Sequence, residues 1–218
     1  MNTRSVGTHD GPFHADEVTA CALLLLFDQI DRDKIHRTRD RSVIDKCEYV
    51  CDVGGIYDPS KKRFDHHQVD YVGKLSSAGM ILEYLNKEKI IEDNLFEHIN
   101  KSLVIGVDAV DNGHVSQPLG HCSYSGVISN FVPPTYDATV DEFNAAFFAA
   151  LDFASGHLSR LLTRYAYAQS CKGKVKQAMQ EGKEVLYFDE AMPWMDAFFE
   201  FGGDDHPAQF LIMPAGKH

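Results

Sequence analysis

Short and long apolar runs alternate along the first 110 residues, and this alternation predicts strands interleaved with helices. The short runs, typical of buried strands, are Ser5–Thr8, Ile35–Thr38 and Tyr49–Val53. The longer runs have helical spacing and cover Glu17–Phe27, Ser76–Leu85, which begins with a serine cap, and Asp93 to about Val107. We therefore expect an α/β domain with a mostly parallel sheet flanked by helices.

The remainder of the chain predicts a second, more helical part. Turn-forming residues are frequent from 118 to 134, so a domain boundary is expected near residue 130. From Val140 to Ala168 apolar residues recur every three or four positions, which predicts one long helix or two in tandem, with Gly156 as a point of interruption. A helix over Lys174–Gly182 and strands over Val185–Phe188 and Phe210–Met213 would complete a smaller C-terminal α+β part. The expected division is residues 1–130 and 131–218.

Composition narrows the class of protein. The 218 residues are 44% hydrophobic, which is ample for a buried core, and the net charge of −11 argues against a broad basic face that binds duplex nucleic acid. The five cysteines are odd in number and scattered, so they predict reduced thiols in a cytoplasmic protein. A basic and apolar leader and an apolar run of membrane-spanning length are both missing from the sequence, so no membrane association is expected.

Imidazole and carboxylate side chains collect where the strands are expected to end. His9, His14 and Asp16 follow the first strand, and Asp52 lies at the end of the third. The carboxyl ends of parallel strands share one crevice, so these side chains can meet there. Such groups bind divalent cations, and two cations a few ångströms apart can clamp the attacking and leaving oxygens of a phosphoryl displacement. The pattern predicts a two-metal phosphoesterase.

The stretch Asp65-His66-His67 adds further ligands. Successive side chains of an extended chain point to opposite faces, so one histidine is expected to bind metal while the other faces substrate or holds the loop. Asp65 could accept a proton from an imidazole and fix its tautomer. Asp52 could bridge two ions through its two oxygens. We expect Asp52, Asp65, His66 and His67 to form the catalytic group.

One more carboxylate ligand is expected from Asp108 or Asp111. Asp111 is favoured because the Asn-Gly pair that follows it permits a tight turn. His114 and His121 lie near this segment in the sequence and are candidates for substrate contact, as is His67.

The residues Gly7–Glu17 and Asp65–Gln68 resemble the DHH phosphoesterase superfamily and, more narrowly, the melanocyte-proliferating-gene (UPF0160) family. The resemblance extends over most of the chain, including Val107–Gly113 and the region around Pro193-Trp194. It implies a parallel-sheet catalytic domain over residues 1–130 and a substrate domain after it. It also implies two Mn²⁺ ions, with Mg²⁺, Co²⁺ or Zn²⁺ as alternatives, and hydrolysis of phosphodiesters, since eukaryotic members are regarded as 3′-to-5′ RNA exonucleases.

The resemblance also implies roles for individual residues. His9, His14 and Asp52 would hold one ion, Asp16, Asp52, His66 and the late aspartate would hold the other, and His67 would face the substrate phosphate. Many superfamily members have aspartate where His14 stands. The family continues beyond a segment such as Pro214–His218, so we expect a shortened substrate domain over residues 131–218.

The expected function is therefore a manganese-dependent phosphoesterase acting as a 3′-to-5′ exonuclease on single-stranded RNA or short oligonucleotides. A pyrophosphatase or a cyclic-dinucleotide hydrolase is an alternative, because the catalytic domain alone does not fix the leaving group. An inactive metal-binding regulatory module is an alternative of a different class. The oligomeric state stays open and is compatible with a homodimer.

Overall fold

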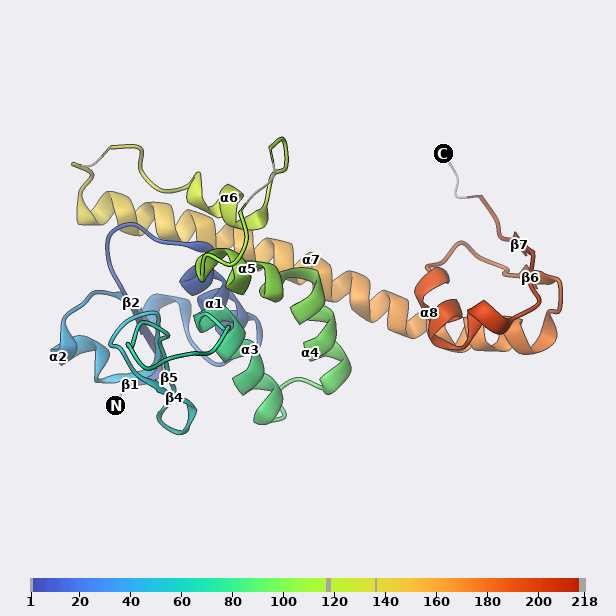
Figure 1. The fold of residues 1–218 in the computed structure, drawn as a ribbon, viewed down its shortest axis with the longest axis horizontal. Helices are drawn as coiled ribbons and strands as arrows, with labels where there is room; N and C mark the ends of the chain where they lie inside the picture. Colours follow the sequence, from blue (N-terminus) through green and yellow to red (C-terminus); the bar gives the residue numbers. More distant parts are fainter. Residues whose placement is uncertain (1, 117–118, 136, 216–218) are drawn as a thin grey trace. The chain divides into compact units, whose positions relative to one another are not determined.

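The structure is a computed structural model that describes residues 2–116, 119–135 and 137–215. It divides into two compact units, residues 1–159 and 160–218, which are described separately below (Figure 1). Two parts of the predicted segments lie outside the described residues. They are residue 118 of the turn-rich stretch and residues 216–218 of the C-terminus. The assignment of catalytic and substrate-binding roles to residues 1–130 and 131–218 stays a prediction.

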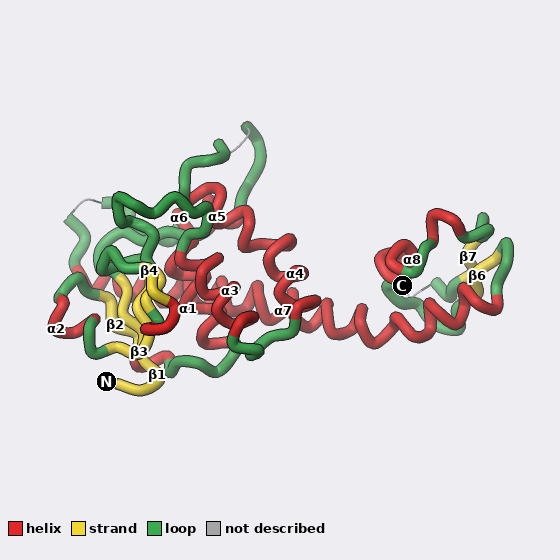
Figure 2. Tube along the Cα trace, turned by 60° about the horizontal axis from the view of Figure 1, so that its bottom comes forward, coloured by secondary structure: helices red, strands yellow, loops and turns green. Residues whose placement is uncertain are grey.

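The first unit is built on a five-stranded sheet in the order β2-β1-β3-β5-β4, drawn in yellow in Figure 2. The strands are β1 (Asn2–Thr8), β2 (Ile35–Arg37), β3 (Cys47–Cys51), β4 (Tyr57–Asp58) and β5 (Arg63–Phe64). Every neighbouring pair is parallel except β4 and β5, which are antiparallel at one edge. The prediction of an α/β fold with a mostly parallel sheet is confirmed.

Helices cover this sheet. They are α1 (Ala15–Leu26), α2 (Arg41–Ile44), α3 (Ser77–Lys87), α4 (Asp93–Ile99), α5 (Ile105–Asp111), α6 (Tyr124–Ser129) and the first part of α7 (Val140–Glu181). The helix expected from Asp93 to about Val107 extends to Asp111 and contains a π-helical turn over Asn100–Val104. Short 3₁₀ turns lie at Arg32–Lys34 and Pro59–Lys61.

α1 forms the centre of the core of the first unit. It packs against α3, α5 and α6 and against β3, and each residue from Ala15 to Leu24 is buried. A helix that is covered on all sides needs apolar residues all round, which explains the run of leucines at its end. Because α1 follows β1 directly, the connecting loop is fixed at the end of the sheet where the metal ligands were expected.

α7 is one continuous helix from Val140 to Glu181. The predicted interruption at Gly156 is wrong, and the helix predicted from Lys174 is the last part of the same element. Glycine costs about 1 kcal/mol inside a helix relative to alanine. The neighbouring Ala154 and Leu158 are fully buried, and their burial outweighs that cost.

The second unit has its own small core. Strands β6 (Val185–Tyr187) and β7 (Phe210–Ile212) pair in parallel, and α8 (Met195–Glu200) and a 3₁₀ turn at Gly203–Asp205 lie between them in the sequence. The core consists of Cys171, Val175, Ala178, Leu186, Phe188, Met192, Ala197 and Phe198, and Trp194 packs against it. The predicted strands and helix of this α+β part are present.

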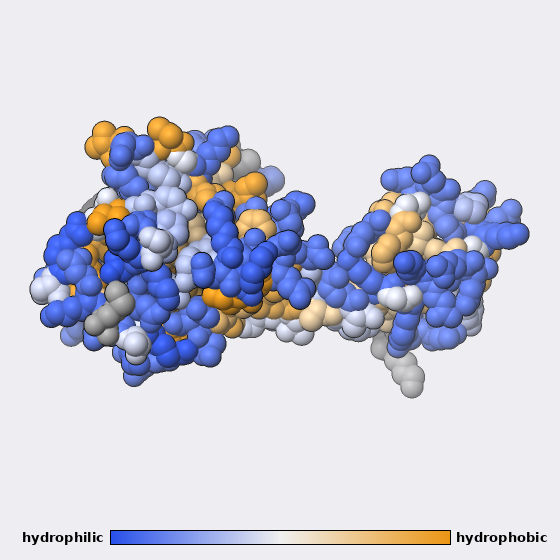
Figure 3. Space-filling model, turned by 90° about the horizontal axis from the view of Figure 1, so that it is seen from below, coloured by the Kyte–Doolittle hydropathy of each residue, from blue (hydrophilic) through white to orange (hydrophobic). Residues whose placement is uncertain are grey.

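The view in Figure 3 shows a mainly hydrophilic surface on both units, with small apolar patches. Within the described residues, the helices are all too short or too polar to traverse a bilayer.

Candidate metal centre

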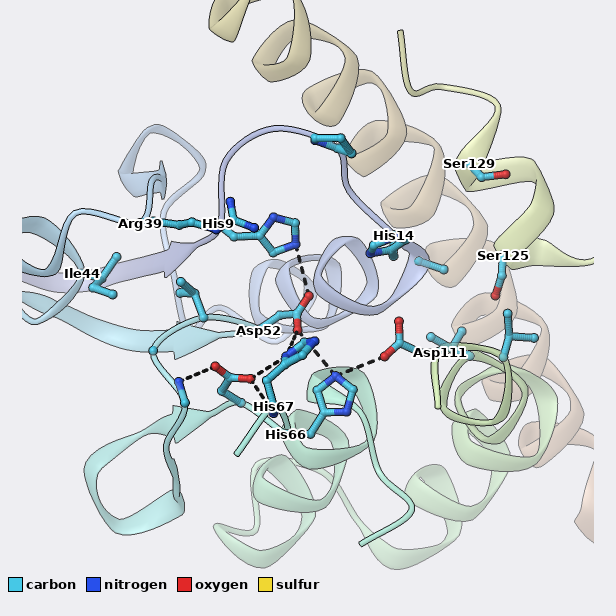
Figure 4. Close-up of a pocket in the computed structure, with 18 of the residues that line it drawn as sticks. His9, His14, Arg39, Ile44, Asp52, His66, His67, Asp111, Ser125 and Ser129 are labelled. Carbon is cyan, nitrogen blue, oxygen red and sulfur yellow. Dashed lines mark hydrogen bonds and ion pairs between the residues drawn. The ribbon is translucent and has the colours of Figure 1, made fainter. Parts of the chain in front are cut away.

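Most of the predicted ligands line a pocket of about 1030 Å³, whereas Asp16 and Asp108 are not among its lining residues. Figure 4 shows His9 and His14 above Asp52, with His66, His67 and Asp111 below and beside it. These side chains come from the loop after β1, the residue after β3, the segment after β5 and the end of α5. The carboxyl ends of parallel strands therefore carry the site, as expected for this class of sheet.

The loop after β1 contributes His9 and His14. His9 is 5% exposed, and its Nε2 lies 3.0 Å from Oε1 of Glu17 and 3.2 Å from Oδ2 of Asp52. His14 is exposed and is the N-cap of α1, where its backbone N–H donates to both carboxylate oxygens of Glu17 at 3.0 and 3.1 Å. Glu17 was not predicted as a site residue. The three-residue spacing from His14, which is that of a capping box, could have indicated it.

Arg37 binds this loop through its guanidinium group. Its guanidinium donates to the carbonyl of Gly11 at 2.6 Å and lies over the rings of Phe13 and Phe147, with centroid distances of 5.5 and 4.6 Å. Gly11 has a φ of +76°, a conformation that glycine adopts without strain. The sequence analysis did not identify Arg37, because its partners on the loop and on α7 are distant in sequence.

Asp52 stands at the centre of the site. It follows β3 directly and has a φ of +55°, which is uncommon for a residue other than glycine. Its Oδ2 faces His9 at 3.2 Å, while its Oδ1 faces His67 at 3.2 Å and His66 at 3.6 Å. The two oxygens of one carboxylate thus face two different groups of ligands.

His66 and His67 have different surroundings. The His66 side chain is 9% exposed, and its Nε2 lies 3.2 Å from Oδ2 of Asp111. The His67 side chain is 64% exposed, and its Nδ1 lies 2.9 Å from Oδ1 of Asp65. Asp65 is buried and also accepts hydrogen bonds from the backbone N–H groups of His67 and Gly55 at 3.0 and 2.5 Å. The Asp65 carboxylate therefore fixes the backbone at two places, at Gly55 and at His67.

Asp16 and Asp108 both contact the beginning of α3. Asp16 is fully buried and accepts hydrogen bonds from the Ser76 hydroxyl at 2.6 Å and from the N–H groups of Ser77 and Ala78 at 3.0 and 2.5 Å. Oδ1 of Asp108 accepts from the N–H groups of Ser76 and Gly79 at 3.0 and 3.1 Å. The Ser76 hydroxyl also lies 2.7 Å from this oxygen, but its single proton is donated to one of the two carboxylates at a time. Asp111, in contrast, directs its carboxylate to His66.

Three groups of candidate metal ligands result, and the ligand atoms in each lie within 4.8 Å of one another. They are His9, His14, Glu17 and Asp52; Asp52, His66 and His67; and Asp16, His66 and Asp111. Oδ1 of Asp52 and Nε2 of His66 are buried and, despite their ion-pair distances, neither makes a hydrogen bond of good geometry in the described structure. Buried polar atoms are costly when unpaired, and a divalent cation would satisfy both. The residues present therefore fit a divalent metal.

The proximity of the carboxylates changes the proton affinity of the histidines. Burial lowers the pKa of His9, but contacts with Asp52 and Glu17 outweigh burial and raise this pKa to about 10. Asp111 and then Asp52 raise the pKa of His66 to about 11 against the opposing effect of burial. Asp52, with Asp65 assisting, raises the pKa of His67 to about 9.

The carboxylates shift in opposite directions. Burial alone would raise the pKa of Asp52, but its contacts with His66, His67 and His9 outweigh burial and hold this pKa well below its usual range. Burial, followed by the charges of Asp52 and Asp111, raises the pKa of Asp16. Ionisable groups whose pKa values are shifted in opposite directions by their surroundings are common at functional sites.

His114 and His121, the two other candidates for substrate contact, are exposed and are not among the residues that line the pocket. Serine residues of α6 line it instead. Figure 4 shows Ser125 and Ser129 on the side opposite His9. Two arginines, Arg39 and Arg41, also line it. The roles of His114 and His121 in substrate binding stay predictions.

Comparison with known proteins identifies relatives over nearly the whole chain. The sequence profile of the MYG1_exonuc family, described as "Uncharacterised protein family (UPF0160)", matches residues 5–217. The MYG1 protein of Chlamydia muridarum is 49% identical over 97% of this chain and 72% of its own length, and the MYG1 protein C694.04c of Schizosaccharomyces pombe is 31% identical over 99% and 77%. The MYG1 exonuclease of Rattus norvegicus is 28% identical over 93% of this chain and 63% of its own length. The search of solved structures gave no match. The extent of these matches shows that the chain belongs to the UPF0160 (MYG1) family.

Proposed function

We propose that this protein is a manganese-dependent two-metal phosphoesterase of the DHH type, acting as a 3′-to-5′ exonuclease on RNA or short oligonucleotides. The observation that carries the proposal is the position of Asp52. Its Oδ2 lies close to His9, and its Oδ1 lies close to His66 and His67. A carboxylate shared in this way is suited to bridge two ions. The relatives named MYG1 exonuclease, from rat and mouse, support a nuclease.

His9, His14, Glu17 and Asp52 would hold the first ion, and Asp52, Asp16, His66 and Asp111 the second. The ligand atoms are nitrogen and carboxylate oxygen without thiolate, which suits Mn²⁺ and also Mg²⁺, Co²⁺ or Zn²⁺. A pair of bound cations would lower the pKa of a shared water and offset the charge that develops on the phosphoryl oxygens.

His67 would contact the substrate. Its Nδ1 is directed to Asp65, so its Nε2 is the ring nitrogen left for the pocket, and most of this side chain is open to solvent. An imidazole N–H in this position can donate to a non-bridging phosphoryl oxygen. The buried Asp65 would orient the ring, as the partner of a catalytic histidine commonly does. The substrate domain would begin after residue 130.

The test is hydrolysis of bis-p-nitrophenyl phosphate and of a short end-labelled RNA in the presence of Mn²⁺, with pyrophosphate as a comparison substrate. We expect activity on both phosphodiesters and a fall of at least about 100-fold for Asp52→Asn, because a neutral amide cannot bridge two cations. Asp93→Asn, at an exposed aspartate outside the pocket lining, is the matched control. Near-normal turnover by the Asp52 variant, or cleavage of pyrophosphate alone, would overturn the proposal.

A further inference from the structure

Two arginines stand at the rim of the candidate metal centre and have no part in the proposed chemistry. Arg39 follows β2, and Arg41 is the first residue of α2. Of the described residues that line the pocket, these two alone carry a permanent positive charge. Figure 4 places Arg39 on the side of the pocket where His9 lies.

Both guanidinium groups are held in place by backbone. Nη1 of Arg39 donates to the carbonyl of Asp10 at 2.7 Å and pairs with the Asp10 carboxylate at 2.6 Å. Nη2 of Arg41 donates to the carbonyl of Gly54 at 2.6 Å, and its Nη1 lies 3.7 Å from Asp45. One arginine is thus anchored to the loop that carries His9, and the other to the loop that follows Asp52.

The anchored groups still have donors for a ligand. The side chains of Arg39 and Arg41 are 62% and 58% exposed, and a guanidinium has five N–H donors. Exposed ion pairs such as those with Asp10 and Asp45 contribute little, typically about 0–1 kcal/mol, so an incoming anion can replace the carboxylate. The planar group matches the oxygens of a phosphate.

Because the whole chain is negatively charged, a polyanionic substrate needs local cationic contacts, and these two residues can provide one. With a net charge of −11, the protein repels a polyanion everywhere except near bound cations and local basic groups. A cation pair would neutralise the scissile phosphate only. A substrate with a second phosphate needs a separate cationic contact, and the rim offers one.

We propose that Arg39 and Arg41 bind the phosphate next to the scissile one, so that the site prefers oligonucleotides with at least two linkages over substrates with a single phosphodiester. This inference rests on the proposed function for the identity of the site. Binding can nevertheless be measured without turnover, which separates the two.

The probe is a fluorescent trinucleotide whose linkages carry methylene in place of the leaving oxygen, so that both keep their charge and neither is cleaved. Two analogues each have one linkage replaced by an uncharged methylphosphonate. Fluorescence anisotropy with the full chain and Mn²⁺ gives the dissociation constants. We expect the analogue whose uncharged linkage is the one next to the scissile 3′-terminal linkage to bind the wild type roughly tenfold more weakly than the charged probe, because it has lost the arginine contact. For Arg39→Gln and Arg41→Gln, this difference should shrink to about twofold or less.

Arg32→Gln is the matched control. Arg32 is also an exposed arginine paired with an aspartate, Asp152, at 2.6 Å, and it does not line the pocket. It should keep the full discrimination. Equal affinity of the wild type for all three probes, or discrimination that persists in the Arg39 and Arg41 variants, would overturn the inference. Hydrolysis of bis-p-nitrophenyl phosphate by the wild type, measured in parallel, reports on the proposed function alone.

Discussion

Asp108 and Asp111 are three residues apart on α5, yet their carboxylates have different partners. Asp108 is 4% exposed and accepts hydrogen bonds from the backbone N–H groups of Ser76 and Gly79. Asp111 has a side chain that is 15% exposed and lies beside His66. We therefore propose that Asp108 supports α3 and that Asp111 is the metal ligand of the two.

This difference gives a paired prediction. Asp108→Ala should lower the free energy of unfolding by about 2–4 kcal/mol, because the buried N–H groups of Ser76 and Gly79 lose their acceptor. Asp111→Ala should leave stability within about 1 kcal/mol of the wild type and weaken Mn²⁺ binding at least about tenfold. Urea denaturation and calorimetric titration measure the two effects. An Asp111 variant with unchanged metal affinity would reject it as a ligand.

The raised pKa values of the site histidines predict how metal binding depends on pH. With pKa values of about 10 for His9 and about 11 for His66, both imidazoles carry a proton at pH 7 in the metal-free protein. A ligating histidine must be neutral, so binding would release these protons. Affinity should rise by up to about 100-fold per pH unit when two protons are released, and it should fall in acid.

Calorimetric titration with Mn²⁺ at one pH in buffers of different ionisation enthalpy counts the protons. The apparent binding heat should change with the buffer in proportion to the protons released. Heats that are the same in every buffer would contradict ligation by protonated histidines. A titration of His36→Gln, which changes a histidine outside the pocket lining, should match the wild type.

At the scale of elements, α3 and α5 meet at a glycine. A Cβ added to Gly79 would overlap the carboxylate of Asp108, whereas one added to Gly106 on α5 would contact nothing within 4 Å. The Asp108 carboxylate cannot yield easily, because Ser76 and Gly79 hold it. The close approach of these helices places the Asp108 carboxylate against the first turn of α3.

We predict opposite effects for two glycine-to-alanine changes. Gly79→Ala should destabilise the protein by about 1–3 kcal/mol through overpacking. Gly106→Ala should stabilise it by about 0.5–1 kcal/mol, because alanine is the better helix former and space is free. Thermal denaturation of both variants in the same buffer provides the comparison. A Gly79 variant as stable as the wild type would show that Asp108 moves without cost.

Elements were easier to predict from the sequence than the contacts between them. Strands β1, β2 and β3 coincide with short apolar runs in the sequence. The positions of His9, His14, Asp16 and Asp52 near strand ends could therefore be predicted. The continuity of α7 past Gly156 could not, because the burial of Ala154 and Leu158 depends on partners elsewhere in the chain. The same holds for Arg37, whose proximity to the site depends on tertiary packing with the loop after β1 and with α7.

At the scale of the molecule, the two compact units have separate cores. The candidate metal ligands all belong to residues 1–159, whereas the single tryptophan, Trp194, packs against the core of residues 160–218. The fluorescence of Trp194 therefore reports on the unit of residues 160–218, which lacks the proposed metal ligands.

This separation predicts a selective effect of metal. Mn²⁺ at 100 times its dissociation constant should stabilise the first unit by about 2.7 kcal/mol, and a chelator should reverse this. Far-ultraviolet circular dichroism should follow the shifted transition, while the Trp194 fluorescence transition should stay at the same temperature. An equal shift of both signals would show that the units unfold together.

The fixed position of Asp16 has a consequence for a loaded centre. Three donors at the first turn of α3 hold its carboxylate in the interior, whereas His14 lies in contact with solvent. Asp16 would therefore offer an ion a carboxylate whose position is already set, whereas His14 could reorient toward an ion. Metals that demand strict ligand geometry should accordingly be selected mainly at the Asp16 side of the centre.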